Sequence, residues 1–411
     1  MTDRMADGAA PGGKAPRQKL PRTVIVLGLV SFFNDVASDI VIPLIPILLA
    51  TVLAAGPVAL GLVEGVADAV ASLLKLWAGR HSDRIGGRRM PLMLAGYTLS
   101  NIARPLLALA GSWVAVLVLR SVDRVGKGIR SAPRDALVAD VTPPPLLGRA
   151  FGVHRAFDNG GAVLGGLLAA AALAAFNPSL QTIIVLSALP GAVCILMLLG
   201  VREAPARKRD EPLPPLSWAV LSPGMRRYLA VLGLVTFARV SDTFIVLYGH
   251  GLGVGVIELL VLWSALNAVK SLGAYAGGVL SDRIGRKAVM LASWIAFAAS
   301  YYFLCTTTTH LGLWWVTAGY GIFAGLSEGA ERALIKELGR PGEYGTAFGW
   351  YHLIVGLSAI PAGVLFGALW QFQSAAMAFS FAAAAAALGA LLLRFWVAPA
   401  LHRHRTGSPA H

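Results

Sequence analysis

The sequence predicts an all-α polytopic membrane protein, with twelve transmembrane helices arranged as two parallel six-helix repeats. Three observations lead to this prediction. Hydrophobic residues make up 56% of the 411 residues and charged residues only 14%, whereas about a quarter of the residues in a soluble globular chain are charged. Apolar runs of membrane-spanning length recur along the chain, and sequence motifs of the first half return in the second half.

A transmembrane helix needs about 20 predominantly apolar residues to cross the hydrocarbon core. Runs of that kind begin near Thr23, Val58, Met90, Trp113, Ala150, Leu180, Arg227, Val256, Ala288, Gly312, Ala347 and Ala375. Charged residues interrupt the third, fourth and tenth runs. A polar interval separates the sixth run from the seventh, so the sequence divides into six spans plus six.

Basic residues alternate between the connections. Every second connection contains no Lys or Arg: 54–57, 111–112, 176–181, 249–256, 305–310 and 370–374. The connections between these are basic. Because membrane proteins keep Lys and Arg on the cytoplasmic side, we expect a multi-pass protein of the cytoplasmic (inner) membrane with both termini in the cytoplasm.

These patterns predict five segments along the chain. They are a disordered cytoplasmic tail over 1–22, a six-helix bundle over 23–200, a cytoplasmic central loop over 201–226, a second six-helix bundle over 227–398 and a cytoplasmic tail over 399–411. The N-terminal stretch has no apolar core, so it does not indicate a cleavable signal peptide.

The net charge of +14 does not indicate nucleic-acid binding, because the basic residues lie at the ends of apolar runs and not on a polar face. Cys194 and Cys305 lie within apolar runs of different halves. Neither a disulfide framework nor a metal site is therefore indicated.

Segments of the first half recur in the second. PRDALVAD (133–140) corresponds to AERALIKE (330–337), and RHSDRIGGRR after the second span returns as VLSDRIGRK after the eighth. Because each half has six spans, both copies have the same orientation. Such parallel repeats are related by an axis along the membrane normal, with a binding site between them near the bilayer midplane.

Taken together, these features resemble the major facilitator superfamily. A GxxxDRxGRR-like loop after the second and eighth spans is typical of that family, and the resemblance covers nearly the whole chain after the tail. The phrase DRVGKGIRSAPRDALVAD is similar to a prokaryotic, mostly uncharacterised subgroup of the family. The resemblance implies a transporter that acts as a single chain, without a cofactor, by rocking its two halves.

The loop motif is expected to act as a gate. An acidic residue beside arginines, with glycines that permit tight turns, can form an ion-pair latch between helix ends. The candidate gating residues are Gly79, Asp83, Arg84, Gly86, Arg88, Gly278, Asp282, Arg283, Gly285 and Arg286. The resemblance implies that Asp83 and its arginines stabilise the outward-facing state. The alternative is a static, solvated tether.

The fourth span fills with charge before it ends. Positions 120, 124, 127, 131 and 134 share one helical stripe, with Asp123 and Arg130 beside it. Since charges within a membrane pair with one another or face water, we expect a buried charge network in the first half. The candidate substrate and proton residues are Asp35, Asp39, Asp68, Arg120, Asp123, Arg155, Asp158, Asp242 and His352.

Three interpretations of this network remain open. The arginines bind an anionic or zwitterionic solute while an aspartate carries a proton; the ion pairs are structural links between helices; or the charges coat a helix end beyond the hydrocarbon. For Lys127 to Asp140 we favour charges that coat a helix end beyond the hydrocarbon. For Arg120 and Asp123 we favour solute and proton binding or a structural link between helices. Asp35 is the preferred proton carrier, with a structural acid as the alternative, and for His352 a packing role is favoured.

The sequence therefore predicts a secondary active transporter of a small organic solute, with proton-coupled efflux by alternating access as the expected activity. Uptake symport or facilitated transport of an anionic or zwitterionic metabolite is the alternative, and a non-transporting sensor is less favoured. No GxxxxGK[ST] or HExxH pattern occurs, so neither ATP hydrolysis nor an enzyme is indicated. The expected partners are the lipid bilayer, the solute and protons, without cofactor or metal.

Overall fold

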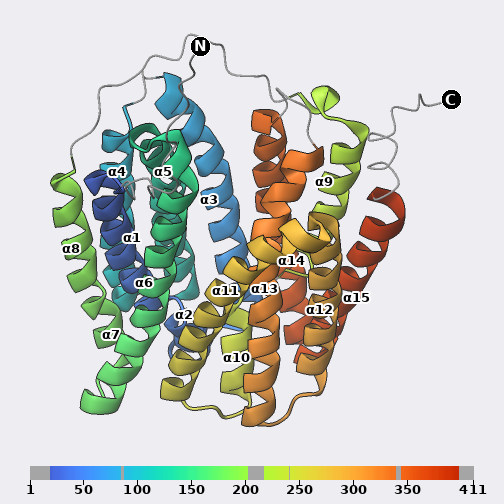
Figure 1. Ribbon diagram of the computed structural model, residues 1–411. Helices are drawn as coiled ribbons and strands as arrows, with labels where there is room; N and C mark the ends of the chain where they lie inside the picture. The colour runs from blue at the N-terminus through green and yellow to red at the C-terminus, as the bar shows by residue number, and fades with distance from the viewer. Residues whose placement is uncertain (1–18, 85–87, 202–216, 240, 339–343, 398–411) are drawn as a thin grey trace, which may run out of the picture.

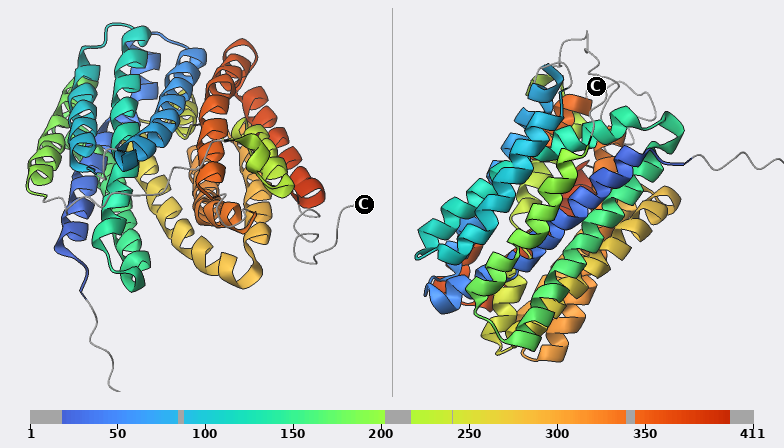
Figure 2. Two further views of the ribbon diagram at one scale, coloured as in Figure 1. Left: turned by 90° about the horizontal axis from the view of Figure 1, so that it is seen from above. Right: turned by 90° about the vertical axis from the view of Figure 1, so that its left-hand side faces the viewer.

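The computed structural model describes residues 19–84, 88–201, 217–239, 241–338 and 344–397. Within these residues all regular structure is helical, and the helices form two bundles that lie side by side (Figures 1 and 2). Most of the predicted 1–22 tail, most of the predicted 201–226 loop and the 399–411 tail lie outside the described residues.

The first bundle consists of six rods that run alternately in opposite directions. They are α1 (Arg22–Val41) with α2 (Leu44–Ile47) and a π-helical end (Leu48–Val52), α3 (Pro57–Arg84), α4 (Met90–Leu106) with a 3-10 turn (Leu107–Leu109), α5 (Trp113–Val141), α6 (Leu147–Phe176), and α7 (Leu180–Leu186) with α8 (Ala188–Leu199).

The second bundle repeats this arrangement. Its rods are α9 (Pro223–Thr236) with α10 (Thr243–Gly251), α11 (Val256–Ile284), α12 (Arg286–Thr306), α13 (His310–Leu338), α14 (Tyr344–Phe372), and α15 (Ala375–Leu392) with a π-helical end (Leu393–Val397). In Figure 1 the start of α1 and the end of the last rod both lie in the upper part of the view. The terminal face is defined here as the face where α1 begins at Arg22 and the last rod ends at Val397, and the opposite face is where α3 begins and α14 ends.

Hydropathy accounts for most of these rods. Nine helical stretches of the described residues are long and apolar enough to cross a membrane. The other rods, α5, α13 and α9 with α10, carry several charges or a break, yet they run alongside the apolar ones (Figure 1). The predicted all-α polytopic architecture is confirmed.

Serine caps mark where several helices begin. The hydroxyls of Ser112, Ser179, Ser222 and Ser374 each accept a hydrogen bond from the backbone N–H three residues later. The first N–H groups of a helix have no partner within the helix, and a polar group left unpaired in an apolar medium is costly. Each serine satisfies one of these groups at the start of its helix.

The halves meet along two seams, α3 against α14 and α6 against α11. Glycines make the first seam a backbone contact. A Cβ on Gly61 would lie 2.0 Å from the carbonyl oxygen of Gly363, and a Cβ on Gly363 would lie 2.3 Å from that of Gly61. Nearer the opposite face, the backbone N–H of Val58 donates to Oε1 of Gln371 at 3.3 Å. The bundles are therefore closed towards the opposite face.

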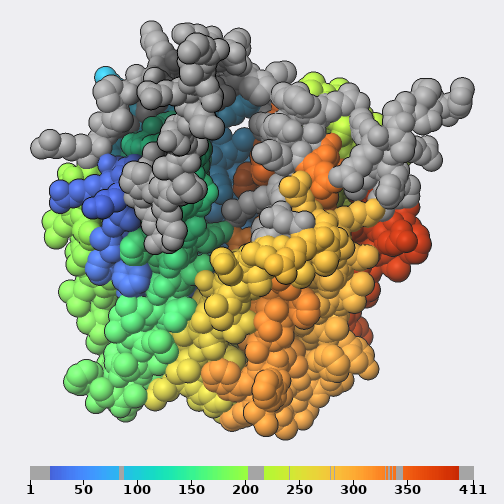
Figure 3. Space-filling model, in the orientation of Figure 1, coloured from blue at the N-terminus to red at the C-terminus, as the bar shows by residue number. Residues whose placement is uncertain are grey.

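Towards the terminal face the bundles separate. Figure 3 shows a hollow between them in the upper part of the molecule, with α3 visible at its back. The space between the bundles is thus closed towards the opposite face and open towards the terminal face.

Gly61→Ala tests the α3–α14 seam. The new Cβ would overlap the backbone of Gly363, and overpacking of this kind costs about 1–3 kcal/mol. We expect a lower melting temperature for the purified protein in mild detergent.

Gly319→Ala is the matched control, because a Cβ there has no neighbour within 4 Å. Alanine is favoured over glycine inside a helix by about 0.5–1 kcal/mol, so this variant should melt at the same or a higher temperature. Equal shifts for the two variants would contradict the close approach of α3 and α14.

Candidate functional site

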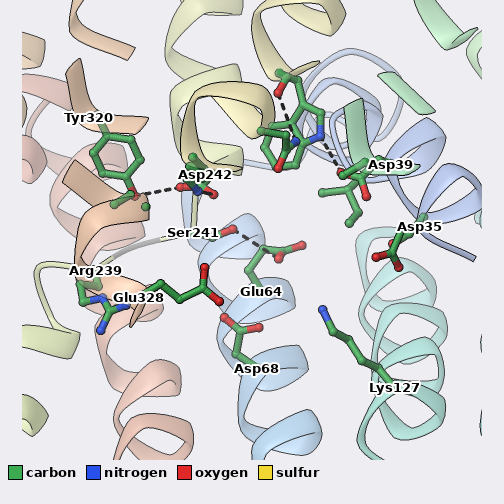
Figure 4. A pocket seen from close by; sticks show the side chains of 18 of the residues that line it. Asp35, Asp39, Glu64, Asp68, Lys127, Arg239, Ser241, Asp242, Tyr320 and Glu328 are labelled. Atoms are coloured by element: carbon green, nitrogen blue, oxygen red, sulfur yellow. Dashed lines mark hydrogen bonds and ion pairs between the residues drawn. The ribbon is translucent and has the colours of Figure 1, made fainter. Parts of the chain in front are cut away.

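A cavity of about 440 Å³ lies between the bundles, within the size range of small-molecule sites. Figure 4 shows that the side chains labelled in it are mostly charged and point towards its interior. Its ionisable lining residues are Asp35, Asp39, Glu64, Asp68, Arg120, Arg124, Lys127, Arg239, Asp242, Lys270 and Glu328. They come from both halves of the chain, so the cavity is the candidate binding site.

One wall of the cavity is a fully paired charge network. Arg120 on α5 contacts Glu64 on α3 through Nε at 3.2 Å and Asp123 through Nη1 at 3.2 Å. Asp123 in turn accepts a hydrogen bond from Nε of Arg104 on α4 at 3.0 Å. All four side chains are buried. Two cations and two carboxylates therefore neutralise one another, as charges removed from water require.

The network also reaches α1. Nη1 of Arg104 donates to the backbone oxygen of Asn34 at 3.0 Å and to the amide oxygens of Asn34 and Asn101 at 3.1 and 3.0 Å. Sequence reasoning treated Arg104 only as an interruption of the third span. Its position one helix away from Asp123 was the available signal, because a charge within a membrane demands a partner.

The second half pairs its own charges. Lys270 on α11 forms an ion pair with Asp242, whose other oxygen accepts a hydrogen bond from the hydroxyl of Tyr320 at 2.8 Å. Arg239 contacts the buried carboxylate of Glu331 on α13 at 2.8 Å. Asp242, a candidate from the sequence, thus lines the cavity as one member of an ion pair.

Five ionisable side chains of the cavity form no ion pair with any described residue: Asp35, Asp39, Asp68, Arg124 and Lys127. Asp35 accepts a hydrogen bond from Asn34 at 2.8 Å, and Asp39 accepts one from Nε1 of Trp263 in the second half at 2.9 Å. Nε of Arg124 is buried without a hydrogen-bond partner. These groups remain available to a ligand or a proton.

The structure corrects the interpretation of Lys127 to Asp140 as a solvated helix end. Lys127 lies in the middle of α5 and lines the cavity. Arg130 is buried, donates to Ser100 Oγ at 2.8 Å and lies 4.6 Å from the ring centre of Tyr97. Only the last turns, near Asp140, fit the expectation. Partners on α4 hold the guanidinium of Arg130 inside the bundle, whereas the side chain of Lys127 is exposed to solvent.

The candidate residues divide into two groups. Asp35, Asp39, Asp68, Arg120 and Asp242 line the cavity. Asp123 lies behind it in the paired network. Asp158 is buried 3.7 Å from Arg134 and 3.6 Å from His154, and His352 on α14 packs its ring against Tyr351. None of these last three residues lines the cavity.

Arg155 instead bridges the two halves. Its Nη2 forms an ion pair with Glu328 on α13, and one turn along α6 the amide of Asn159 donates to Ser271 Oγ on α11 at 2.9 Å. Both contacts lie towards the terminal face, the first between α6 and α13 and the second within the α6–α11 seam. Arg155 therefore holds the bundles together beside the cavity.

The loop motif places arginines against acids at the ends of α5 and α13. Arg89 contacts Asp140 at 3.4 Å, and Arg286 contacts Glu337, the repeat equivalent of Asp140, at 3.5 Å. Sequence reasoning sought the acid within the loop, and the repeat alignment was the missed signal.

The structure describes four of the other gating candidates. A Cβ on Gly79 would lie 3.3 Å from that of Ala132, Gly285 has a φ of +89°, and Arg88 and Arg283 are exposed. The remaining candidates fall outside the side chains that the structure describes: Asp83, Arg84, Gly86, Gly278 and Asp282.

The family profile described as Major Facilitator Superfamily matches residues 27–269 and 229–410. The chain belongs to this superfamily. It is 29% identical over 384 residues to an uncharacterised MFS-type transporter of Methanocaldococcus jannaschii, covering 92% of this chain and 96% of that protein. It is 27% identical to the fosmidomycin resistance protein of Escherichia coli, covering 86% and 88%.

Solved transporters share the fold. A crystal structure of the nucleoside transporter NupG superposes with a TM-score of 0.75 at 14% identity, covering 92% of this chain and all of that one. The xylose transporter XylE of E. coli, in a partially occluded inward-open conformation, gives 0.70 at 14% identity, covering 91% and 97%. The chain is thus a member of a transporter family with the corresponding fold.

Asp123→Asn tests the paired network. It leaves the buried guanidinium of Arg104 without its carboxylate, and breaking a buried pair from one side costs about 3–5 kcal/mol. A large drop in melting temperature is expected in detergent.

Asp140→Asn is the control on the same helix. Its side chain is 52% exposed, and exposed pairs contribute about 0–1 kcal/mol, so this variant should melt close to the wild type. The double variant Asp123→Leu with Arg104→Met should recover part of the loss. No difference between the two single variants would contradict the network.

A double-mutant cycle tests the Arg155–Glu328 bridge. Arg155→Glu places two carboxylates together across the α6–α13 contact, and Glu328→Arg places two guanidinium groups together; each should lower the melting temperature. The combined exchange restores opposite charges and should recover most of the loss, with a coupling of about 0.5–3 kcal/mol. Strictly additive losses would show that the two side chains do not interact.

Proposed function

We propose that this protein exports a small organic solute in exchange for protons by alternating access. The observation that carries the proposal is the cavity between the halves, in which the carboxylates Asp35, Asp39 and Asp68 form no ion pair with a described residue. A carboxylate already held by a salt bridge must break that pair to take up a proton. Asp35, Asp39 and Asp68 can take up a proton without breaking an ion pair to a described residue.

Asp35 is the proposed proton carrier. It lies on α1 where α6 approaches closely, since a Cβ on Gly161 would be 3.2 Å from the Cβ of Asp35. An ionised carboxylate that is withdrawn from bulk water and has no salt-bridge partner is costly, so protonation and solute binding are alternative ways to relieve the same cost. Asp39 and Asp68 line the same cavity and would serve as further acceptors.

Alternating access follows from the closed seam. The contact between α3 and α14 would open at the opposite face while the contacts beside Arg155 tighten, so that the cavity changes the side from which it is reached. We place both termini, the central loop and the loop motifs in the cytoplasm, with each six-helix bundle moving as a unit in the inner membrane. One chain contains the complete cavity, which supports a functional monomer.

The proposed direction of transport is export. Similarity to a protein named for fosmidomycin resistance favours export. Uptake symport of an anionic or zwitterionic metabolite is the second candidate, and the unpaired cations Arg124 and Lys127 favour it because they can hold an anion.

Asp35→Asn tests the proton assignment. In proteoliposomes with an imposed pH gradient, the wild type should move protons when a transported solute is added from a panel that includes fosmidomycin. The variant should lose this solute-dependent proton movement, because an amide cannot take up the proton, and it should keep solute exchange when the solute is present at saturating concentration on both sides.

Glu258→Gln is the matched acid-to-amide control, since Glu258 lies near the opposite face, paired with His310 at 3.5 Å and outside the cavity. It should behave as the wild type. Undiminished proton movement in Asp35→Asn would show that another group carries the proton.

A further inference from the structure

We infer that the transported solute is a small zwitterion, whose anionic group binds Arg124 and Lys127 and whose cationic group occupies Asp35 in place of the proton. This inference rests on the proposed exchange of solute for protons and names the class of solute. It follows from the charges that the cavity leaves unpaired.

Arg124 is the strongest evidence for an anionic group. The residue is only 6% exposed, lines the cavity, and makes no hydrogen bond or ion pair with a described residue. A guanidinium carries five N–H donors and no acceptor, and an unpaired buried charge is strongly unfavourable. Lys127 lies one turn further along α5, lines the same cavity and is also without an ion pair there. Together they are suited to bind an anionic group.

The acceptor for a cationic group is Asp35. The described ionisable groups that interact electrostatically with it are Asp39 on α1 itself, Arg104 on α4, Lys127 and Arg130 on α5, and Asp158 on α6. Arg104 is committed to Asp123, and Arg130 to Ser100 and Tyr97. Asp35 therefore keeps an oxygen free for a ligand, and Asp68 lies across the cavity (Figure 4).

A solute with charge of one sign fits only part of this lining. A pure anion would neutralise Arg124 and Lys127 and leave three carboxylates, whereas a pure cation would leave the buried guanidinium of Arg124 unpartnered. A zwitterion complements both sets. The cavity is also lined by Ile42, Trp263, Phe297 and Tyr320, which suit an apolar portion of the solute.

The arrangement also accounts for the sign of coupling. A solute ammonium and a proton cannot occupy the same oxygen of Asp35, so binding of one excludes the other, as exchange requires. A solute that were only anionic would bind together with a proton, which is the behaviour of a symporter. The zwitterion thus reconciles the unpaired cations with export.

Matched sets of probes test the inference on the purified full-length protein. One set shares the phenylalanine skeleton: phenylalanine, phenethylamine and 3-phenylpropionate. A second uses leucine, isopentylamine and 4-methylpentanoate, and glycyl-phenylalanine and aminoethylphosphonate extend the zwitterions. At millimolar concentration we expect at least one zwitterion to raise the melting temperature, and neither of its singly charged relatives to do so. Its affinity should increase as the pH is raised, because fewer protons then compete for Asp35.

Variants connect this binding to the named residues. Arg124→Gln and Lys127→Gln should each weaken the zwitterion at least tenfold, while Arg227→Gln, outside the cavity beside Trp396, should not. Arg124→Gln also removes an unpaired buried charge, so the ligand-free protein should melt at the same or a higher temperature. A ligand-free Arg124→Gln that melts far below the wild type would show that Arg124 is a structural residue and would overturn its assignment.

The outcomes separate the inference from the proposed function. Three outcomes would each overturn the inference: stabilisation by the anionic probes alone, stabilisation by the cationic probes alone, or no stabilisation by any zwitterion. If the anionic probes alone stabilise the protein and protons move inward together with them, the protein is a transporter that works as a symporter. If a zwitterion binds as expected but moves no protons in proteoliposomes, the site assignment stands and the proposed exchange fails.

Discussion

The cost of placing charge inside a membrane governs this structure. A charged side chain in hydrocarbon persists only when it is paired or reaches water, and the first bundle meets this condition with the linked pairs of Glu64, Arg120, Asp123 and Arg104. Because these residues lie on α3, α5 and α4, and Arg104 also binds Asn34 on α1, the network fixes four helices relative to one another. What remains unpaired beside it defines the binding cavity.

Hydropathy and charge distribution were sufficient to predict the rods, because the length of an apolar run is a local property. The predicted starts near Thr23, Val58 and Met90 lie within a residue of the helices at Arg22, Pro57 and Met90. Pairing is not local. Sequence reasoning took the dense charge after Arg124 as a helix leaving the membrane, since it could not see Ser100 and Tyr97 on α4 beside Arg130.

For the candidate site as well, the sequence indicated which residues are charged within spans but not which residues pair with them. Asp35, Asp39 and Asp68 stood out because they interrupt apolar spans, and they do line the cavity. Arg155 looked similar in sequence, but its partner Glu328 lies in the other half, at a separation that no periodicity reveals. The repeat could have revealed one thing more: the pair of Arg89 and Asp140 recurs as Arg286 and Glu337, whereas the unpaired charges of the cavity belong to the first half alone among the described residues.

The α3–α14 seam has a kinetic consequence. Side chains that interlock across an interface must reorder each time it parts, and each immobilised long side chain costs up to about 2 kcal/mol of rotamer entropy. Gly61 and Gly363 have no side chain to reorder, and their backbones touch directly. The two helices can therefore part at this point without rearranging interlocked side chains. Their parting would be limited by lipid and water entering the gap, so the turnover of the carrier should depend on the viscosity of the surrounding bilayer.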